Sequence, residues 1–324
     1  MLTYDRMTLD STGAFLLGEL ERLDQQLHEP LVSVTWGRDI DLREDVSIAD
    51  ESSSFTNSTF AAAGGIQSAG KNFIGKNTNV ITGIALDIGK TVSPLYLWGT
   101  EISYTIPELL SAQQLGRPVD EQKFAGMQLK WQMDIDEMVY IGDTALGKYG
   151  LVNNDAVTSG FVSAGDAGST TWVLKTPAEI LADVNALIVA AWAAAGYAIC
   201  PTKLLLPPSQ FAYITSQTVS DAGNISILKF LQDNCISLSI NGKKLDIQPL
   251  KWLTGRGTAA GSPSTATDRM VVYTQDKQRV RYPLVPMQRT PLEYRSIYHL
   301  TTYFGRLGVL EIVYPETLYY ADGI

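Results

Sequence analysis

The stretch "RPVDEQKFAGMQLKWQMDIDEMVYIGDTALGKYGLVNN" (residues 117–154) carries the strongest structural signal in the chain. Pro118 suits the first position of a helix, and the acidic residues that follow it favour the positive end of the helix dipole. The pattern predicts a helix over about residues 118–141, roughly 36 Å long, that ends at Gly142 and leads through a glycine-rich turn into "GLVNN". Its apolar stripe comprises Phe124, Met127, Trp131, Ile135, Met138 and Val139.

A second helix start is "TPAE" at residues 176–179. Thr176 and Glu179 have the spacing of a capping box, and Pro177 again suits the first helical position, so a helix is expected from there to Ala195. Elsewhere helices and strands do not alternate regularly, which indicates an α+β fold. We expect further helices at about residues 11–28, 210–216 and 224–234, and strands at 203–206, 245–252, 269–274, 278–282 and, on either side of a turn at Pro315, in the last segment.

Residues 51–94 are rich in Gly, Ser and Asn and alternate like an extended ribbon. A connection of this length without a core of its own is unusual in a compact domain. This ribbon is therefore expected to be either disordered or shaped by something outside the chain, and we favour a partner subunit.

The ribbon contains "GGIQSAGKNFIGKN" (residues 64–77). The glycine–lysine spacing of a phosphate-binding loop occurs in it two times, once ending at Lys71 and once at Lys76. Both lysines are followed by Asn rather than by the Ser or Thr that reaches magnesium. No buried strand precedes the loop, and no clear helix follows it. An NTPase remains the enzyme alternative on this motif, but a glycine-rich hairpin is the better interpretation.

Composition and charge exclude several classes of protein. The 324 residues carry a net charge of −9, which argues against a sequence-independent grip on DNA or RNA. Two cysteines are too few for a disulfide framework, and the longest apolar run, residues 186–195, is too short to cross a bilayer. A soluble protein of a reducing cytoplasm is expected, with no membrane partner.

The charge is unevenly distributed along the chain. Residues 1–51 hold twelve acidic residues against four arginines, whereas residues 268–306 hold seven basic residues against three acidic ones. This complementarity predicts that the N-terminal segment lies on the C-terminal region, in the same chain or in a neighbour.

The sequence offers no credible catalytic group. His28 and His299 have no partner at metal-ligand spacing, and neither Ser68 nor Ser163 lies in a nucleophile elbow. We expect no enzymatic activity, no cofactor and no metal ion.

The order of these elements, with "EISYTIPELL", "DEMVYIGDTALGKYGLVNN", "TPAEILADVNALI", "PPSQF" and the terminal "GVLEIVYPETLYYADGI", resembles the major capsid proteins of tailed bacteriophages with the Hong Kong ninety-seven-type fold. The resemblance covers essentially the whole chain. It implies a shell protein that self-assembles as hexamers and pentamers into an icosahedral capsid around phage double-stranded DNA. The virion would be its location, after assembly in the cytoplasm of the host bacterium.

The resemblance also implies a division of the chain. Residues 1–45 would be an N-terminal arm, 46–98 an extended E-loop that lies over a neighbouring subunit, and 99–176 a peripheral domain with the spine helix at about 118–141. Residues 177–286 would form an axial domain, and 287–324 would return to the peripheral domain. A scaffold, a portal and decoration proteins are implied as partners besides other copies of the chain.

Some members of this fold join an E-loop Lys to a peripheral-domain Asn by an isopeptide bond. Lys71 and Lys76 could supply the amine, but no Asn follows Asn241, so we predict no such cross-link. A covalent ladder of boiled particles on a denaturing gel would contradict this. Lys71, Lys76, Arg279 and Arg281 are the residues expected at contacts between subunits, the two arginines against the acidic arm of the next copy.

An alternative on the same fold is an encapsulin-like compartment whose shell encloses a cargo enzyme. The expected helix at residues 11–28 would then face inward and hold the cargo.

Overall fold

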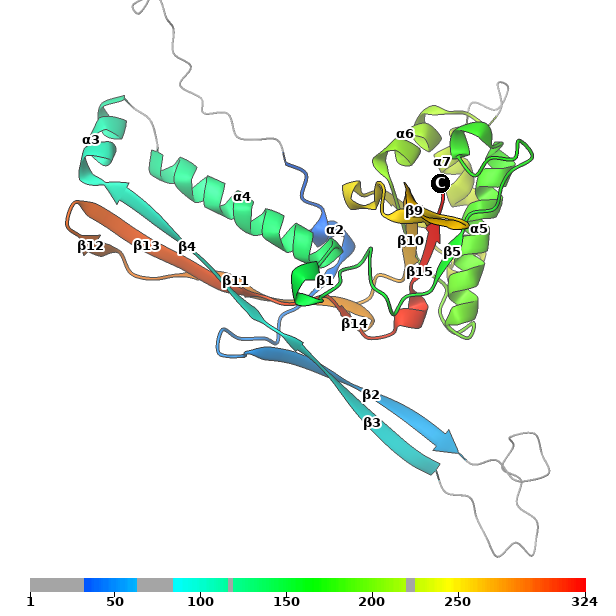
Figure 1. The fold of residues 1–324 in the computed structure, drawn as a ribbon, viewed down its shortest axis with the longest axis horizontal. Helices are drawn as coiled ribbons and strands as arrows, with labels where there is room; N and C mark the ends of the chain where they lie inside the picture. Colours follow the sequence, from blue (N-terminus) through cyan, green and yellow to red (C-terminus); the bar gives the residue numbers. More distant parts are fainter. Residues whose placement is uncertain (1–31, 63–83, 116–118, 220–224) are drawn as a thin grey trace, which may run out of the picture. The chain divides into compact units, whose positions relative to one another are not determined.

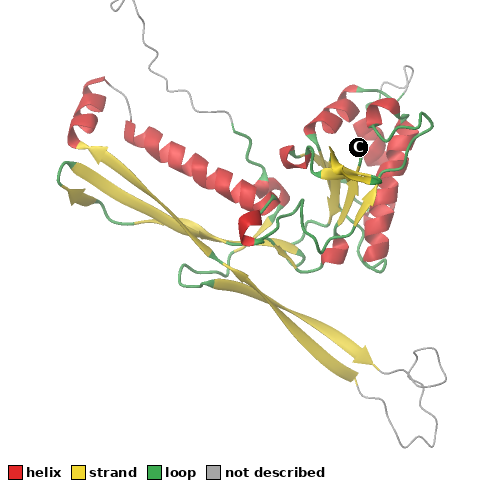
Figure 2. Ribbon diagram, viewed as in Figure 1, coloured by secondary structure: helices red, strands yellow, loops and turns green. Residues whose placement is uncertain are grey.

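The structure is a computed structural model that describes residues 32–62, 84–115, 119–219 and 225–324. The expected helix at residues 11–28 and the loop at 64–77 lie outside these ranges. The described chain divides into two compact units, of which the smaller includes residues 101–131 and 290–302 and the larger includes 34–100, 132–289 and 303–324. Both contain helices and strands (Figures 1 and 2), so the predicted α+β class is confirmed.

The predicted long helix is α4 (Val119–Tyr140), and a shorter helix, α3 (Ile106–Leu115), precedes it. Just beyond α4, Gly142 adopts the left-handed conformation, with φ of 73°. The chain then passes through the 3-10 turn η1 (Thr144–Leu146) and runs back along the end of the helix. This junction corresponds to the predicted glycine-rich turn.

Residues 150–153 satisfy backbone groups that the end of α4 would otherwise leave unpaired. The Gly150 amide donates to the carbonyl of Ile141 at 3.0 Å, and the Leu151 amide donates to that of Val139 at 2.9 Å. Asn153 adds a hydrogen bond from its side-chain amide to Ile141. A Cβ atom on Gly150 would collide with the backbone of Tyr140, so only glycine fits here.

One sheet of the larger unit has the strand order β5–β15–β10–β6–β7. Helix α5 (Pro177–Ala194) packs on it, and Thr176 and Glu179 form the predicted capping box. The α5 helix is long and apolar enough to pass as a membrane span by length and composition, but one face of it contributes to this core. The strands are β5 (Ser159–Phe161), β6 (Lys203–Leu206), β7 (Asp246–Pro249), β10 (Arg269–Tyr273) and β15 (Tyr319–Asp322); helices α6 (Pro208–Ser216), α7 (Ile227–Asn234) and α8 (Ile236–Asn241) and the short turns η2 (Trp172–Leu174) and η3 (Lys251–Leu253) complete this part.

The last strand, β15, pairs with β10 and β5 in the sheet that carries α5. The expected division of the chain, with residues 287–324 in the peripheral domain, stays a proposal. The pairing is reinforced by the ion pair between Arg269 and Asp322, at 2.6 Å, and by the burial of Tyr320. The turn η4 (Pro315–Thr317) separates β15 from the strands before it.

A second sheet has the order β1–β11–β13–β12, with β14 beside β11 and β4 beside β13. Its strands are β1 (Asp41–Arg43), β4 (Tyr96–Thr105), β11 (Val280–Arg289), β12 (Glu293–Arg295), β13 (Tyr298–Leu307) and β14 (Glu311–Ile312). The hairpin β12–β13 closes with Ser296 in a left-handed conformation, φ 57°, and places the ring of His299 at 4.7 Å from that of Tyr294. His299 is thus packed against an aromatic ring.

Between the strands expected at residues 245–252 and 269–274, where the sequence predicted no element, the structure has a hairpin, β8 (Gly257–Ala259) and β9 (Ser262–Thr267). Gly261, with φ of 76°, supplies the left-handed residue that the tight turn needs. The sequence prediction failed here because Ser, Thr and Ala at alternating positions give no hydrophobic alternation.

Candidate functional site

The ribbon expected in the sequence is a two-stranded hairpin formed by β2 (Ser52–Ala62) and β3 (Ile84–Pro94). The strands pair along all 11 residues, from Ser52 opposite Pro94 to Ala62 opposite Ile84, and neither joins another strand of the described chain (Figure 1). The first described residues after the lysine-containing loop form strand β3.

The hairpin presents large apolar side chains to solvent. Leu86, Ile88 and Val92 alternate along β3 and are 53%, 61% and 53% exposed. Residues two apart on a strand face the same side, so these three share one face. An isolated two-stranded hairpin is at best marginally stable in water, and an exposed apolar face of this kind marks an interaction surface.

The base of the hairpin is tied to the rest of the chain through the buried carboxylate of Glu311 on β14. This side chain is fully buried and accepts hydrogen bonds from Arg43 at 3.1 and 3.2 Å, from Arg281 at 2.7 Å, and from the hydroxyl of Ser53 on β2. Arg43 also pairs with Asp45 at 2.6 Å. One carboxylate therefore joins β1, β2 and β11.

Two of the residues expected at subunit contacts are in ion pairs of their own chain. Arg281 binds Glu311, and Arg279 binds Asp276, three residues before it. Both arginines keep about a fifth of their side chains exposed, 22% and 23%. Their role between subunits stays a proposal, as does that of Lys71 and Lys76, which lie outside the described residues.

The described part of the acidic arm does lie against the basic C-terminal region of the same chain. Strand β1 pairs in parallel with β11, so that Asp41 lies opposite Arg281. The predicted charge complementarity between the N-terminal segment and the C-terminal region is thus met in part within one chain.

Before β1, the short helix α2 (Trp36–Asp39) is held by a buried cluster around Asp39. Its carboxylate accepts from Arg38 at 2.7 and 2.9 Å and from the Tyr140 hydroxyl at 2.5 Å, and it pairs with Lys203 of β6 at 3.0 Å. Burial opposes ionisation of Asp39, but these partners together hold its pKa below the usual range. Burial and the neighbouring Asp39 raise the pKa of Tyr140 well above its usual value.

Asp136, on the buried side of α4, anchors the same segment. One carboxylate oxygen accepts from the amides of Thr35 at 2.9 Å and Trp36 at 3.1 Å, and the other accepts from the indole of Trp252 at 2.7 Å. Lys251 lies 3.3 Å from it. These contacts satisfy a buried carboxylate and position the chain that leads to the hairpin.

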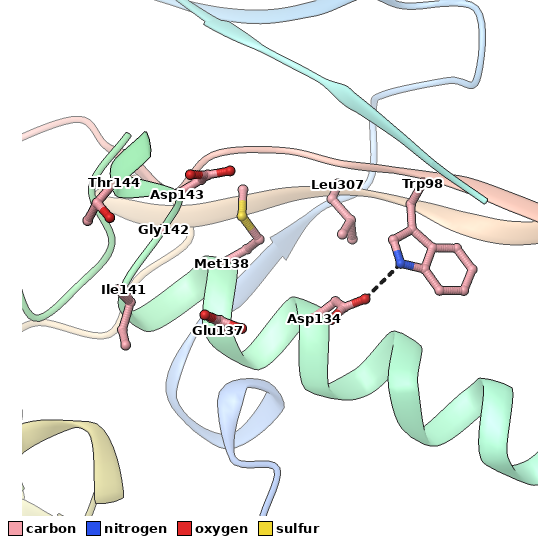
Figure 3. A pocket seen from close by; sticks show the side chains of 9 residues that line it. All are labelled: Trp98, Asp134, Glu137, Met138, Ile141, Gly142, Asp143, Thr144 and Leu307. Atoms are coloured by element: carbon pink, nitrogen blue, oxygen red, sulfur yellow. Dashed lines mark hydrogen bonds between the residues drawn. The ribbon is translucent and has the colours of Figure 1, made fainter. Parts of the chain in front are cut away.

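A groove of about 370 Å³ runs beside the C-terminal end of α4, between the helix and strands β4 and β13 (Figure 3). In Figure 3, Met138 and Leu307 lie between Trp98 and Asp143, and the Trp98 indole donates to Asp134 at 2.8 Å. The groove is lined by Trp98, Asp134, Glu137, Met138, Ile141, Gly142, Asp143, Thr144 and Leu307.

Among the described residues, the ionisable groups whose pKa values are strongly shifted have structural explanations. Burial raises the pKa values of Tyr273, Tyr282 and Tyr320 in the core. Burial also raises the pKa of Asp183, which binds Lys175 at 2.6 Å. Within residues 32–62, 84–115, 119–219 and 225–324, no group of three or more His, Cys, Asp or Glu could hold a metal ion. The surfaces that stand out are the hairpin and the groove, both suited to protein contacts.

Comparison with known proteins points the same way. The sequence profile of a family described as major capsid protein matches residues 70–324. The comparison with curated proteins gave no significant match.

Several solved structures share the fold. The capsid of Myoviridae phage XM1 has a TM-score of 0.74 at 15% identity, over 95% of this chain and 98% of that one. A chain of Mycobacterium phage Ogopogo has a TM-score of 0.56 at 11% identity, over 96% and 98%. A virus-like particle from Pyrococcus furiosus has a TM-score of 0.50 at 12% identity, over 88% and 90%. At such identities the likeness is one of fold, and the fold is that of tailed-phage capsids, as the sequence resemblance implied.

Proposed function

Because the chain belongs to the major capsid protein family, and is thus a structural shell protein, we propose that it assembles as hexamers and pentamers into an icosahedral shell around phage double-stranded DNA. The observation that carries this proposal is the hairpin β2–β3. It has 11 residues in each strand, its two strands pair with each other and with no other strand in the part of the chain that the structure describes, and it exposes Leu86, Ile88 and Val92. A neighbouring subunit in a shell would cover this face.

The proposal assigns a mechanical role to each part of the chain. Residues 1–45 form the arm, 46–98 the E-loop, 99–176 the peripheral domain with its spine helix, and 177–286 the axial domain. Residues 287–324 return to the peripheral domain, and their last strand, β15, pairs with β10. The carboxylate of Glu311 would fix the angle at which the E-loop leaves its own subunit.

The acidic balance of the chain suits a shell wall that encloses DNA without holding it. A net charge of −9 disfavours contacts that release counterions from phosphates. DNA can then leave without dissociating from the wall. The protein would assemble in the host cytoplasm with a scaffold, a portal and decoration proteins as partners, and would have no catalytic role.

Shortening the hairpin tests this function directly. Replacing residues 56–90 by Asn-Gly would join Phe55 to Thr91, which are already paired, through a favoured two-residue turn. Glu311 keeps its contacts to Arg43, Ser53 and Arg281 in this variant. We expect a folded subunit with native circular dichroism that forms no shells in a sizing column or by electron microscopy. Normal shells from this variant would contradict the proposal.

The compartment alternative differs in content rather than in fold. Shells purified from the native host would contain DNA if the proposal is correct and an enzyme if the alternative is. Nuclease-protected DNA in the particles, quantified after heat release, distinguishes the two.

A further inference from the structure

The groove beside α4 has the chemistry of a docking site for a basic, apolar segment. Its lining includes the apolar side chains of Met138, Ile141 and Leu307 and the indole of Trp98, which donates a hydrogen bond to Asp134. Three carboxylates, those of Asp134, Glu137 and Asp143, line it without any basic residue among the lining set. A ligand here must bring positive charge and apolar side chains together.

One segment of the chain meets this requirement. Residues 52–86 contain no acidic residue, and their only charges are Lys71 and Lys76, which flank Phe73 and Ile74 in "GKNFIGKN". The groove of about 370 Å³ has room for both apolar side chains, because an apolar cavity of about 150 Å³ already takes a benzene molecule. Residues 1–31, the other long segment outside the described residues, carry six acidic residues against two arginines, so like charges would repel them from the groove.

The segment cannot reach the groove of its own subunit. Lys76 lies eight residues before Ile84, and a fully extended chain of that length spans roughly 29 Å. From Ile84, β3 and β4 run nearly in line for fourteen residues to Trp98 (Figure 1), which is roughly 46 Å at the rise of a strand. Lys71 is similarly limited, because it follows Ala62, opposite Ile84, by nine residues.

We propose that the groove formed by Trp98, Asp134, Glu137, Met138, Asp143 and Leu307 binds residues 70–77 of a second copy of this chain. The lysines pair with the carboxylates at the groove, and Phe73 and Ile74 pack on Met138 and Leu307. The flexible thioether of Met138 allows the groove to adjust to these side chains. This inference rests on the proposed function and specifies where the end of each E-loop is held.

A charge exchange tests the contact. Glu137 is exposed on α4, so Glu137→Lys leaves the core unchanged. An exposed ion pair contributes up to about fivefold to an equilibrium, and its reversal replaces attraction by repulsion. We expect Glu137→Lys or Lys76→Glu alone to lower the association constant for assembly roughly tenfold. In the double variant Glu137→Lys/Lys76→Glu, the association constant should return to within about threefold of the wild-type value.

Glu316→Lys is the matched control, since Glu316 is also exposed but lies outside the groove. It should leave assembly unchanged and should not rescue Lys76→Glu. A Glu137→Lys variant that assembles like wild type, or a double variant no better than the single ones, would overturn the docking proposal.

Cross-linking of wild-type particles gives a second readout that needs no variant. A carbodiimide joins a lysine amine to a carboxylate in direct contact, and mass spectrometry should then find Lys71 or Lys76 linked to Asp134, Glu137 or Asp143. Mixed particles of isotope-labelled and unlabelled subunits should show the link between copies. Shells that lack these links would refute the docking site and leave the proposed function standing; wild-type protein that forms no shells would refute the proposed function and the docking site with it.

Discussion

Replacing Asp39 by Asn should destabilise the subunit by about 3 kcal/mol, because it leaves a buried cation without its closest charged partner. The Lys203 side chain is 2% exposed, and its ammonium lies 3.0 Å from the fully buried Asp39 carboxylate. Removing one partner of a buried ion pair costs roughly 3–5 kcal/mol. Lys203 would keep Asp246 at 3.2 Å, whose side chain is 47% exposed, and the carbonyl of Arg38 at 2.8 Å, so the lower end of this range applies.

The double variant Asp39→Asn/Lys203→Met separates the ion pair from the other contacts of Asp39. Lys203→Met alone should cost about 2 kcal/mol, since Asp39 keeps Arg38 and the hydroxyl of Tyr140. The double variant removes both charges and should cost no more than about 3 kcal/mol, which gives a coupling energy of about 2 kcal/mol.

The assay is urea unfolding of unassembled subunits isolated by size exclusion, followed by circular dichroism. Lys244→Met is the control, because the Lys244–Asp233 pair is 56% and 40% exposed and should contribute less than about 1 kcal/mol. A loss below about 1 kcal/mol for Asp39→Asn, or single losses that simply add in the double variant, would refute the reasoning.

Three further predictions concern other parts of the chain. Hydrogen bonds from the amide of Asp166 and from the amide and hydroxyl of Thr176 lower the pKa of Glu179 to about 2. The contribution of Glu179 to stability is therefore present above about pH 4 and is lost as the pH falls towards 2. Glu179→Gln should flatten that part of the curve of unfolding free energy against pH, and an unchanged curve would contradict this. Gly150→Ala should prevent accumulation of soluble subunit, because the added Cβ would collide with backbone atoms. Gly126→Ala, in the interior of α4, meets no atom within 4 Å and should raise the free energy of unfolding by about 0.5–1 kcal/mol. Equal soluble yields of the two variants would contradict this prediction. Glu311→Gln should lower the free energy of unfolding by about 2–4 kcal/mol in the same urea assay, because Arg43 and Arg281 lose a buried carboxylate partner. A change under about 1 kcal/mol would show that the contacts of Glu311 are not needed for stability.

Local signals in the sequence were sufficient for the elements that depend on near neighbours. The periodicity of α4, the break at Gly142 and the capping box at Thr176 and Glu179 are all set within a few residues. The tight return after α4 was also indicated by its glycines, although the collision that makes Gly150 obligatory depends on the backbone of Tyr140 and appears only in the structure.

Long-range pairings could not be derived from the sequence. Asp39 and Lys203 are 164 positions apart, and the residues around Glu311 come from three separate strands. Charge counts correctly indicated that the arm would meet the C-terminal region, but they could not show that Arg281 would be held by Glu311 of its own chain. The groove depends on Trp98, α4 and Leu307, which approach one another only through the sheet pairing of β4 and β13.

Electron microscopy of the purified full-length protein, beside its elution volume on a sizing column, tests the central claim most directly. The account predicts closed shells of uniform size that are built from hexamers and pentamers of this chain. A monodisperse monomer or dimer that persists at high protein concentration and on co-expression with a scaffold would contradict it.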